Sequence, residues 1–172
     1  MSHTLVRVSL SDDELHYAAV AGVNRRIRAL QRNRKPNQPG TSYQKQNWWQ
    51  TDITGCIGEL AVAKAFGVDW YDTTDDPGGF DVLHYQVRST EREMPELIVR
   101  GRDNPDDCFI LARVYKNRVL LYGWATGVEV RARGHEKYEP GTSVLMGYEV
   151  NPMEYLITPI LYNSQVTPYT DE

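Results

Sequence analysis

Cysteine is scarce in this chain of 172 residues, and so are long apolar runs. The two cysteines, Cys56 and Cys108, are too few for a disulfide scaffold or a cysteine-based zinc site, and we expect both to be small buried residues in a reducing compartment. No segment approaches the roughly 18 apolar residues of a membrane span, and the N-terminus lacks the apolar run of a secretory signal. The sequence therefore predicts one cytoplasmic domain over residues 1–172 that does not bind membranes.

The sequence motifs of several common chemistries are also missing. It contains no GxGxxG, no GxxxxGK[ST] phosphate loop, no HExxH and no GxSxG. The histidines are scattered without the spacing of metal ligands: His3, His16, His84 and His135. These absences argue against those nucleotide-binding sites, a histidine-based zinc site and a serine-hydrolase site.

Charge is unevenly distributed along the chain. Five aspartates and no basic residue lie between Asp69 and Asp81. Between positions 25 and 45 there is no acidic residue, and the basic residues are Arg25, Arg26, Arg28, Arg32, Arg34, Lys35 and Lys45. Such a distribution suits a protein that binds a polyanion and also holds metal ions, and the alternative is a solvated helix end beside an acidic loop.

Two helices are predicted in the first third of the chain. The first begins at a capping box, Ser11–Glu14, and extends to about Arg32, with an apolar stripe of Leu15, Ala18, Ala19, Val23, Ile27 and Leu30. A basic, aromatic loop is expected over about residues 33–50. The second helix, residues 52–66, buries Ile53, Ile57 and Leu60 and ends at Gly67.

Short strands dominate the rest of the sequence. They are predicted at 68–71, 80–90, 96–100, 108–115 and 118–126, with a tight turn between the last two. A helical turn over 103–107 and a short helix after Asn151 are also indicated, whereas the last ten residues are expected to be loose. This order predicts an α/β or α+β domain with a mixed central sheet.

A small group of polar residues is a candidate for chemistry. Glu59 lies in mid-helix among small residues, and Asp81 follows Gly78-Gly79-Phe80. Gln86 and Arg88 are two residues apart, so they share one face of a strand. Because Asp81 and Gln86 are five residues apart, a bend near residues 83–84 is needed to bring them together. Each residue alone also fits an ordinary polar surface.

In this order, a helical glutamate, Gly-Gly-Phe-Asp and a strand with Gln-Val-Arg resemble the PD-(D/E)XK nuclease superfamily, particularly its small phage-encoded members. The resemblance implies an αβββαβ core with a mixed sheet flanked by helices. It also implies that Glu59, Asp81 and Gln86 hold Mg²⁺ or Mn²⁺ for phosphodiester hydrolysis, with Arg88 as a catalytic residue where lysine is usual. Lys64 is a substitute for that lysine, although it lies about 140° around the helix from Glu59.

The resemblance also implies a nucleic-acid partner. The seven basic residues from Arg25 to Lys45 would contact phosphates, and Trp48 and Trp49 would stack on bases or wedge into a duplex. We expect a DNA endonuclease in the cytoplasm, that of the host cell for a phage protein; RNA and a homodimer stay open. Two alternatives remain, namely a nuclease-fold module that binds DNA or has a structural role without strong catalysis, and an unrelated α+β protein that binds a small ligand.

Overall fold

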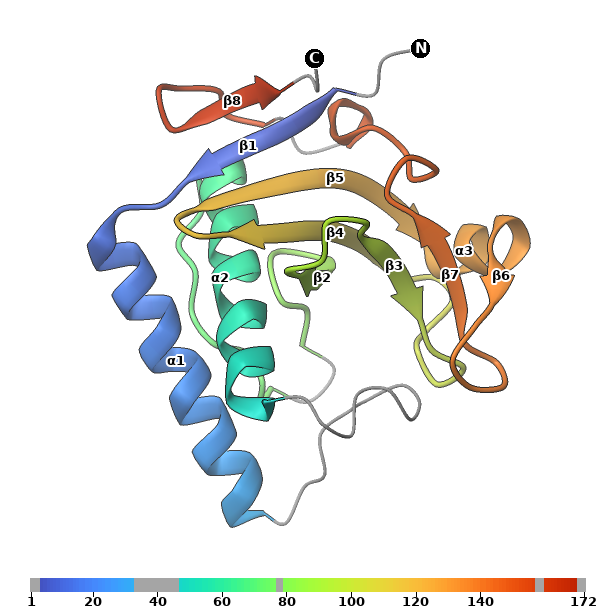
Figure 1. Ribbon diagram of the computed structural model, residues 1–172, viewed down its shortest axis with the longest axis horizontal. Coiled ribbons are helices and arrows are strands. Elements are labelled where there is room, and N and C mark those ends of the chain that lie inside the picture. Colours follow the sequence, from blue (N-terminus) through green and yellow to red (C-terminus); the bar gives the residue numbers. More distant parts are fainter. Residues whose placement is uncertain (1–3, 33–46, 77–78, 157–159, 170–172) are drawn as a thin grey trace.

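Two β-sheets and two long helices make up most of the molecule (Figure 1). The computed structural model describes residues 4–32, 47–76, 79–156 and 160–169. In chain order the elements are β1 (Leu5–Ser9), α1 (Asp12–Gln31), α2 (Trp48–Phe66), β2 (Tyr85–Thr90), β3 (Glu96–Val99), β4 (Cys108–Tyr115), β5 (Arg118–Thr126), α3 (Gly127–Arg133), β6 (His135–Glu136), β7 (Ser143–Met146), the 3₁₀ helix η2 (Met153–Tyr155) and β8 (Val166–Tyr169).

The larger sheet is mixed. Its strand order is β2-β4-β5-β1-β8, in which β2 and β4 are parallel and the other neighbours are antiparallel. The smaller sheet, β3-β7-β6, is antiparallel and lies with α3 at the end of the molecule away from α1 and α2 (Figure 1). The predicted mixture of helices and strands around a mixed central sheet is therefore confirmed.

Strand β4 is buried on both faces and separates two apolar cores. Ile110 and Ala112 belong to the core that also contains the buried residues of α2. Phe109 and Leu111 belong to the other core, together with side chains from β3, β7 and α3. Because successive strand residues point to opposite faces, the layers on either side of β4 follow from its unbroken apolar run.

The ends of the two long helices follow from local sequence. Glu14 donates its backbone N–H to Ser11 Oγ over 3.2 Å, and the Glu14 carboxylate accepts from the Ser11 N–H, which confirms the predicted capping box. Helix α2 starts four residues earlier than predicted because the Asn47 side chain accepts from the N–H of Trp49. Gly67 ends α2 in the left-handed conformation with φ 65°, as predicted.

The buried face of α1 differs from the predicted apolar stripe. The buried residues are Ala18, Gly22 and Arg26, whereas Ile27 is 40% exposed. Gly22 lies so close to α2 that an added Cβ would be 2.5 Å from the Cα of Ile53. Small residues therefore allow the two helices to approach. Of the predicted stripe, Ala18 is buried and Leu15 packs against the core, whereas Ile27 and Leu30 are exposed.

Several predicted elements are placed differently. Residues 68–71 and 80–84 form no extended strand, and 103–107 contain turns without a helix. The last ten residues were expected to be loose, yet β8 pairs with β1. Strand β1, helix α3 and strand β7 were not predicted; the expected short helix after Asn151 is present as η2. Within the described ranges, no helix combines the length and apolarity needed to cross a bilayer.

Candidate functional site

Glu59 is buried between α1 and the larger sheet, and its side chain is only 5% exposed. Arg25 of α1 donates from Nη1 to Glu59 Oε1 over 3.0 Å and from Nη2 to Oε2 over 2.9 Å. The indole Nε1 of Trp70 donates to Oε2 over 3.3 Å. This mid-helix glutamate is thus not an ordinary solvated residue but a buried carboxylate held by a bidentate arginine.

Arg25 also contacts the segment that follows α2. Its Nε and Nη2 atoms donate to Asp72 Oδ1 over 3.2 and 2.8 Å. One guanidinium therefore joins α1, α2 and the segment around residue 72. Its positive charge lies between two carboxylates and partly compensates both.

Asp81 lies at the open edge of β2, where a tight turn reverses the chain. Leu83 in this turn has φ 53°, and the Asp81 N–H donates to the carbonyl of Tyr85 over 3.0 Å. The backbone N–H of Val87 then donates to Asp81 Oδ2 over 2.7 Å. The chain therefore bends at the expected position, and β2 begins at Tyr85 rather than at residue 80.

Burial and neighbouring charges raise the pKa values of both Glu59 and Asp81. Burial and, to a smaller extent, the negative charge of Asp81 raise the pKa of Glu59 to about 7, although Arg25 opposes the shift. Burial also raises the pKa of Asp81, against the lowering effects of the Val87 N–H and the charges of Arg88 and Arg25. Raised carboxyl pKa values of this kind mean that a proton, or a cation in its place, stabilises the region.

Gln86 and Arg88 project together from the face of β2 opposite to α2, as the strand pattern predicts. Gln86 Nε2 donates to Asp107 Oδ2 over 3.3 Å. Arg88 Nη2 donates to Asp103 Oδ2 over 2.9 Å, and its guanidinium lies 4.8 Å from the centre of the Phe109 ring. In this conformation Gln86 does not join Glu59 and Asp81, because the strand itself lies between them.

The oxygen atoms of Glu59 and Asp81 are the candidate ligands for Mg²⁺ or Mn²⁺. Among the residues that the structure describes, no group of three or more histidine, cysteine, aspartate or glutamate side chains could hold a metal ion. Glu59 and Asp81 supply two hard oxygen donors of the kind these ions prefer.

Lys64 points away from Glu59, as its helical position predicts. Its Nζ donates to the Ser9 carbonyl over 2.9 Å and to Glu14 over 2.7 Å.

The basic residues at the end of α1 form ion pairs with aspartates of the same chain. Arg26 is 4% exposed and lies 2.6 Å from Asp52, so its charge is not available at the surface. Arg28 and Arg32 pair with aspartates of the segment after α2. Three of the expected phosphate contacts lie outside the described residues: Arg34, Lys35 and Lys45.

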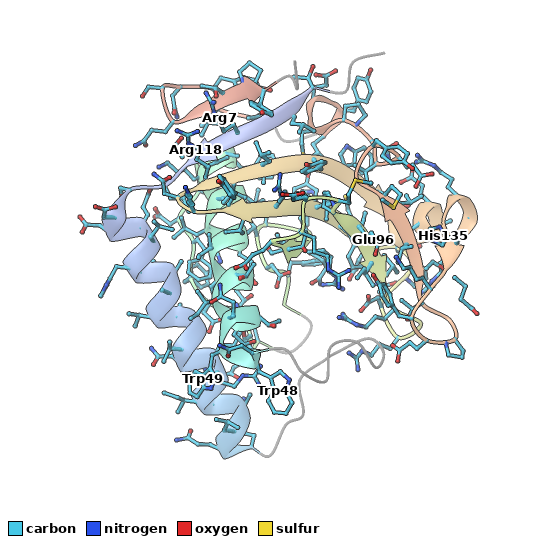
Figure 2. The ribbon with its side chains drawn as sticks, viewed as in Figure 1. Arg7, Trp48, Trp49, Glu96, Arg118 and His135 are labelled. Atoms are coloured by element: carbon cyan, nitrogen blue, oxygen red, sulfur yellow. The ribbon has the colours of Figure 1, made fainter. Side chains whose placement is uncertain are left out.

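Trp48 and Trp49 lie in the first turn of α2 rather than in the expected loop. They are 38% and 41% exposed, and Figure 2 shows both beside the C-terminal half of α1. The Arg26 guanidinium is 5.8 Å from the centre of the Trp48 ring. Both indoles thus keep exposed surface that a base can stack on.

Sequence reasoning missed the residues that organise this site. Arg25 was interpreted only as a phosphate contact, and Trp70 was not among the candidate site residues. Their roles had a weak signal, because Arg25 follows Ala18 and Gly22 on the inward side of α1. Asp103 and Asp107 gave no such signal, since only the tertiary fold brings them to Arg88 and Gln86.

Together these elements define a mixed α and β protein with a buried carboxylate on α2, Glu59, and a partly buried one before β2, Asp81. In comparisons with models of known protein families, with curated proteins and with solved structures, the chain matched none. The functional argument therefore depends on the side chains themselves.

Proposed function

We propose that this protein is a divalent-metal-dependent nuclease that hydrolyses phosphodiester bonds in DNA, and that its core is of the PD-(D/E)XK type. The observation that carries the proposal is a pair of carboxylates with raised pKa values, the buried Glu59 of α2 and the partly buried Asp81 before β2, in which the charge of Asp81 contributes to the shift of Glu59. Keeping carboxylates buried is costly, and such costs concentrate at functional sites.

Glu59 and Asp81 are the residues that would hold the metal. When bound, Mg²⁺ or Mn²⁺ lowers the pKa of a water molecule and offsets charge on the phosphate. The Val87 N–H donates to Asp81 Oδ2 and fixes this side chain. Asp81 Oδ1 accepts no hydrogen bond from the described residues, so it is the oxygen that would bind a ligand. Arg25 fixes both oxygens of Glu59 and must yield at least one of them to a cation.

Arg88 contributes positive charge from β2. It is protonated at any physiological pH, so it can stabilise a phosphate oxygen but cannot accept a proton from water. Its present partners are Asp103 and the carbonyl of Ile98. Binding of a phosphate by Arg88 therefore requires it to exchange or share Asp103.

A second candidate function is a DNA-binding module of the same fold without strong catalysis. It is favoured by the Arg25 fork, which occupies both oxygens of Glu59, and by the contact of Gln86 with Asp107. In this alternative the carboxylates stabilise the fold and take no part in cleavage. The two candidates share their nucleic-acid partner but differ in cleavage.

Cleavage of supercoiled plasmid in Mg²⁺ or Mn²⁺, with EDTA as the negative condition, separates the candidates. For a nuclease we expect metal-dependent nicking that Glu59→Gln or Asp81→Asn reduces at least about a hundredfold, as removal of groups that act on the reacting phosphate does. Asp106→Asn, an exposed position, is the matched control and should cleave normally. Calorimetric titration with Mn²⁺ gives a second readout, since Asp81→Asn should weaken binding.

Other outcomes are equally informative. DNA binding without cleavage, and without an effect of Asp81→Asn on Mn²⁺ affinity, would favour the binding module. Absence of both DNA binding and cleavage would reject both candidates. Labelled RNA of the same sequence, tested in parallel, distinguishes the two nucleic acids.

A further inference from the structure

Two arginines of α1, the arginine at its C-cap and two aspartates of the segment after α2 form an alternating row of charges. The arginine ladder is defined here as Arg25, Arg28 and Arg32, which are separated by three and four residues on one face of α1. Asp72 pairs with both Arg25 and Arg28, and Asp75 pairs with both Arg28 and Arg32. Each carboxylate is therefore bound between two successive guanidiniums.

This arrangement matches the way a phosphate chain would be bound. The guanidinium fork presents the same donors to a carboxylate and to a phosphate oxygen. The carboxylates of Asp72 and Asp75 lie against successive turns at the end of α1. They occupy positions where successive phosphates of a nucleic-acid strand would bind. The arginines that the sequence assigns to phosphate binding are thus already occupied by anions of the same chain.

The acidic segment has a conformation of its own. Thr74 donates from its N–H and its Oγ1 to Asp72 Oδ1 over 3.1 and 2.6 Å, and Thr73 Oγ1 donates to the carbonyl of Phe80 over 2.9 Å. These contacts hold Asp72 toward the helix within a short turn. The segment is therefore shaped for this position independently of the ion pairs.

The outer end of the ladder is open to exchange. The side chains of Arg28, Arg32 and Asp75 are 34%, 44% and 36% exposed, whereas Arg25 and Asp72 are 15% and 12% exposed. Exposed ion pairs contribute little to stability and are screened by salt. A polyanion with many phosphates can therefore replace the pairs of Asp75 first and those of Asp72 afterwards.

We propose that Asp72 and Asp75 act as an intramolecular competitor, which occupies the arginine ladder until the phosphodiester backbone of a nucleic acid displaces it. The inference rests on the proposed function, because it takes nucleic acid as the partner. It also links binding to the candidate site, since Arg25 contacts both Asp72 and Glu59. Displacement of Asp72 leaves Arg25 to be divided between a phosphate and Glu59.

The test measures binding alone, by fluorescence anisotropy of labelled 20-residue DNA and RNA strands in EDTA over a series of salt concentrations. In Asp72→Asn/Asp75→Asn we expect about tenfold tighter binding at 0.1 M salt than in the wild type. The plot of log K against log salt should be steeper by about 2, since three arginines become available at roughly 0.7 each on a single strand. Tighter binding of both the DNA and the RNA strand would indicate that the ladder binds the phosphodiester backbone that they share. Tighter binding of only one would identify which nucleic acid is the partner.

The matched control is Asp12→Asn/Asp13→Asn, which changes the net charge equally at the exposed start of the same helix. It should alter affinity less than about threefold. Adding Arg28→Gln/Arg32→Gln to the neutralised variant should remove the gain. Equal gains in the two double variants, or no gain in Asp72→Asn/Asp75→Asn, would overturn the proposal.

Folding and catalysis are kept separate from this result. Circular dichroism checks that each variant is folded, and Asp75→Asn alone, at the more exposed position, should still give about a threefold gain if the double variant unfolds. Because EDTA prevents metal-dependent cleavage, the binding test is independent of catalysis. A gain in binding, together with no cleavage in the separate plasmid assay with Mg²⁺ or Mn²⁺, would support the competitor and reject the nuclease. Cleavage by the wild type without the gain would do the reverse.

Discussion

Replacing Arg25 by glutamine tests whether the buried ion pair with Glu59 stabilises the protein. In the wild type both oxygens of Glu59 accept from Arg25, over 3.0 and 2.9 Å, and the Glu59 side chain is only 5% exposed. The variant leaves this carboxylate buried, with the Trp70 indole as its remaining donor in the described structure. A buried charge without its partner is strongly unfavourable.

The expected loss of stability in Arg25→Gln follows from the burial of the ion pair. Removing one partner of a buried pair costs about 3–5 kcal/mol, and we expect about 3 kcal/mol because Arg25 is 15% exposed and glutamine can still donate one hydrogen bond. Arg28→Gln, one turn along the helix, is the matched control. Its side chain is 34% exposed, so the loss should be about 1 kcal/mol or less.

The cost should depend on pH in a defined direction. Burial and the charge of Asp81 raise the pKa of Glu59 from 4.5 to about 7, so the folded state binds a proton that the unfolded state releases. The stability that comes from this proton is present at low pH and is lost as pH rises through 7. Without Arg25 the folded pKa rises further, so the variant should be destabilised most at pH 8 and much less at pH 5.5.

Urea unfolding followed by circular dichroism, in EDTA at pH 5.5 and 8.0, measures both effects. The double variant Arg25→Gln/Glu59→Gln should recover at least about 1 kcal/mol relative to the sum of the single changes. A cost below about 1 kcal/mol that is the same at both pH values, with additive single variants, would refute this account of the pair.

Two further changes test the packing of α2 and the cap of α3. Gly58→Ala should destabilise the protein by about 1–3 kcal/mol, because the added Cβ would lie 1.9 Å from Ser89 Oγ. Gly55→Ala is the control and should be neutral or stabilising, since the nearest atom there is 3.5 Å away. Thermal unfolding of the two variants measures the difference. Thr126→Ala should cost about 1 kcal/mol in the same assay, because it removes a capping box in which Glu129 donates its N–H to Thr126 Oγ1 over 3.2 Å; an unchanged melting temperature would contradict this.

The parts of the fold that depend on neighbouring residues were predictable from sequence. The capping box at Ser11, the end of α2 at Gly67 and the strands 108–115 and 118–126 all agree with the structure. Strand β8 was not predictable, because its four residues become a strand only by pairing with β1. The face of α1 was also mispredicted, since close contact at Gly22 decides it rather than side-chain size.

The candidate site was predictable in its acidic residues but not in their partners. The bend that brings Asp81 to the edge of β2 follows from the spacing of Asp81 and Gln86, and it is present. The contacts of Arg25 with Glu59 and of Gln86 with Asp107 join residues far apart in the chain. Local patterns do not encode such contacts, so a basic cluster looked like a free surface although its described members are paired.

The position of β1 affects the order in which the protein can be assembled during translation. Residues 5–9 are made before all of their partners in the sheet, which are residues 118–121 and 166–169. The helical hairpin of α1 and α2 can form as soon as it is synthesised, since the ion pair of Arg26 and Asp52 lies within it. Strand β1 must wait for residues 166–169 before its pairing is complete, so its apolar residues Leu5, Val6 and Val8 remain open to chaperones until that segment has been made.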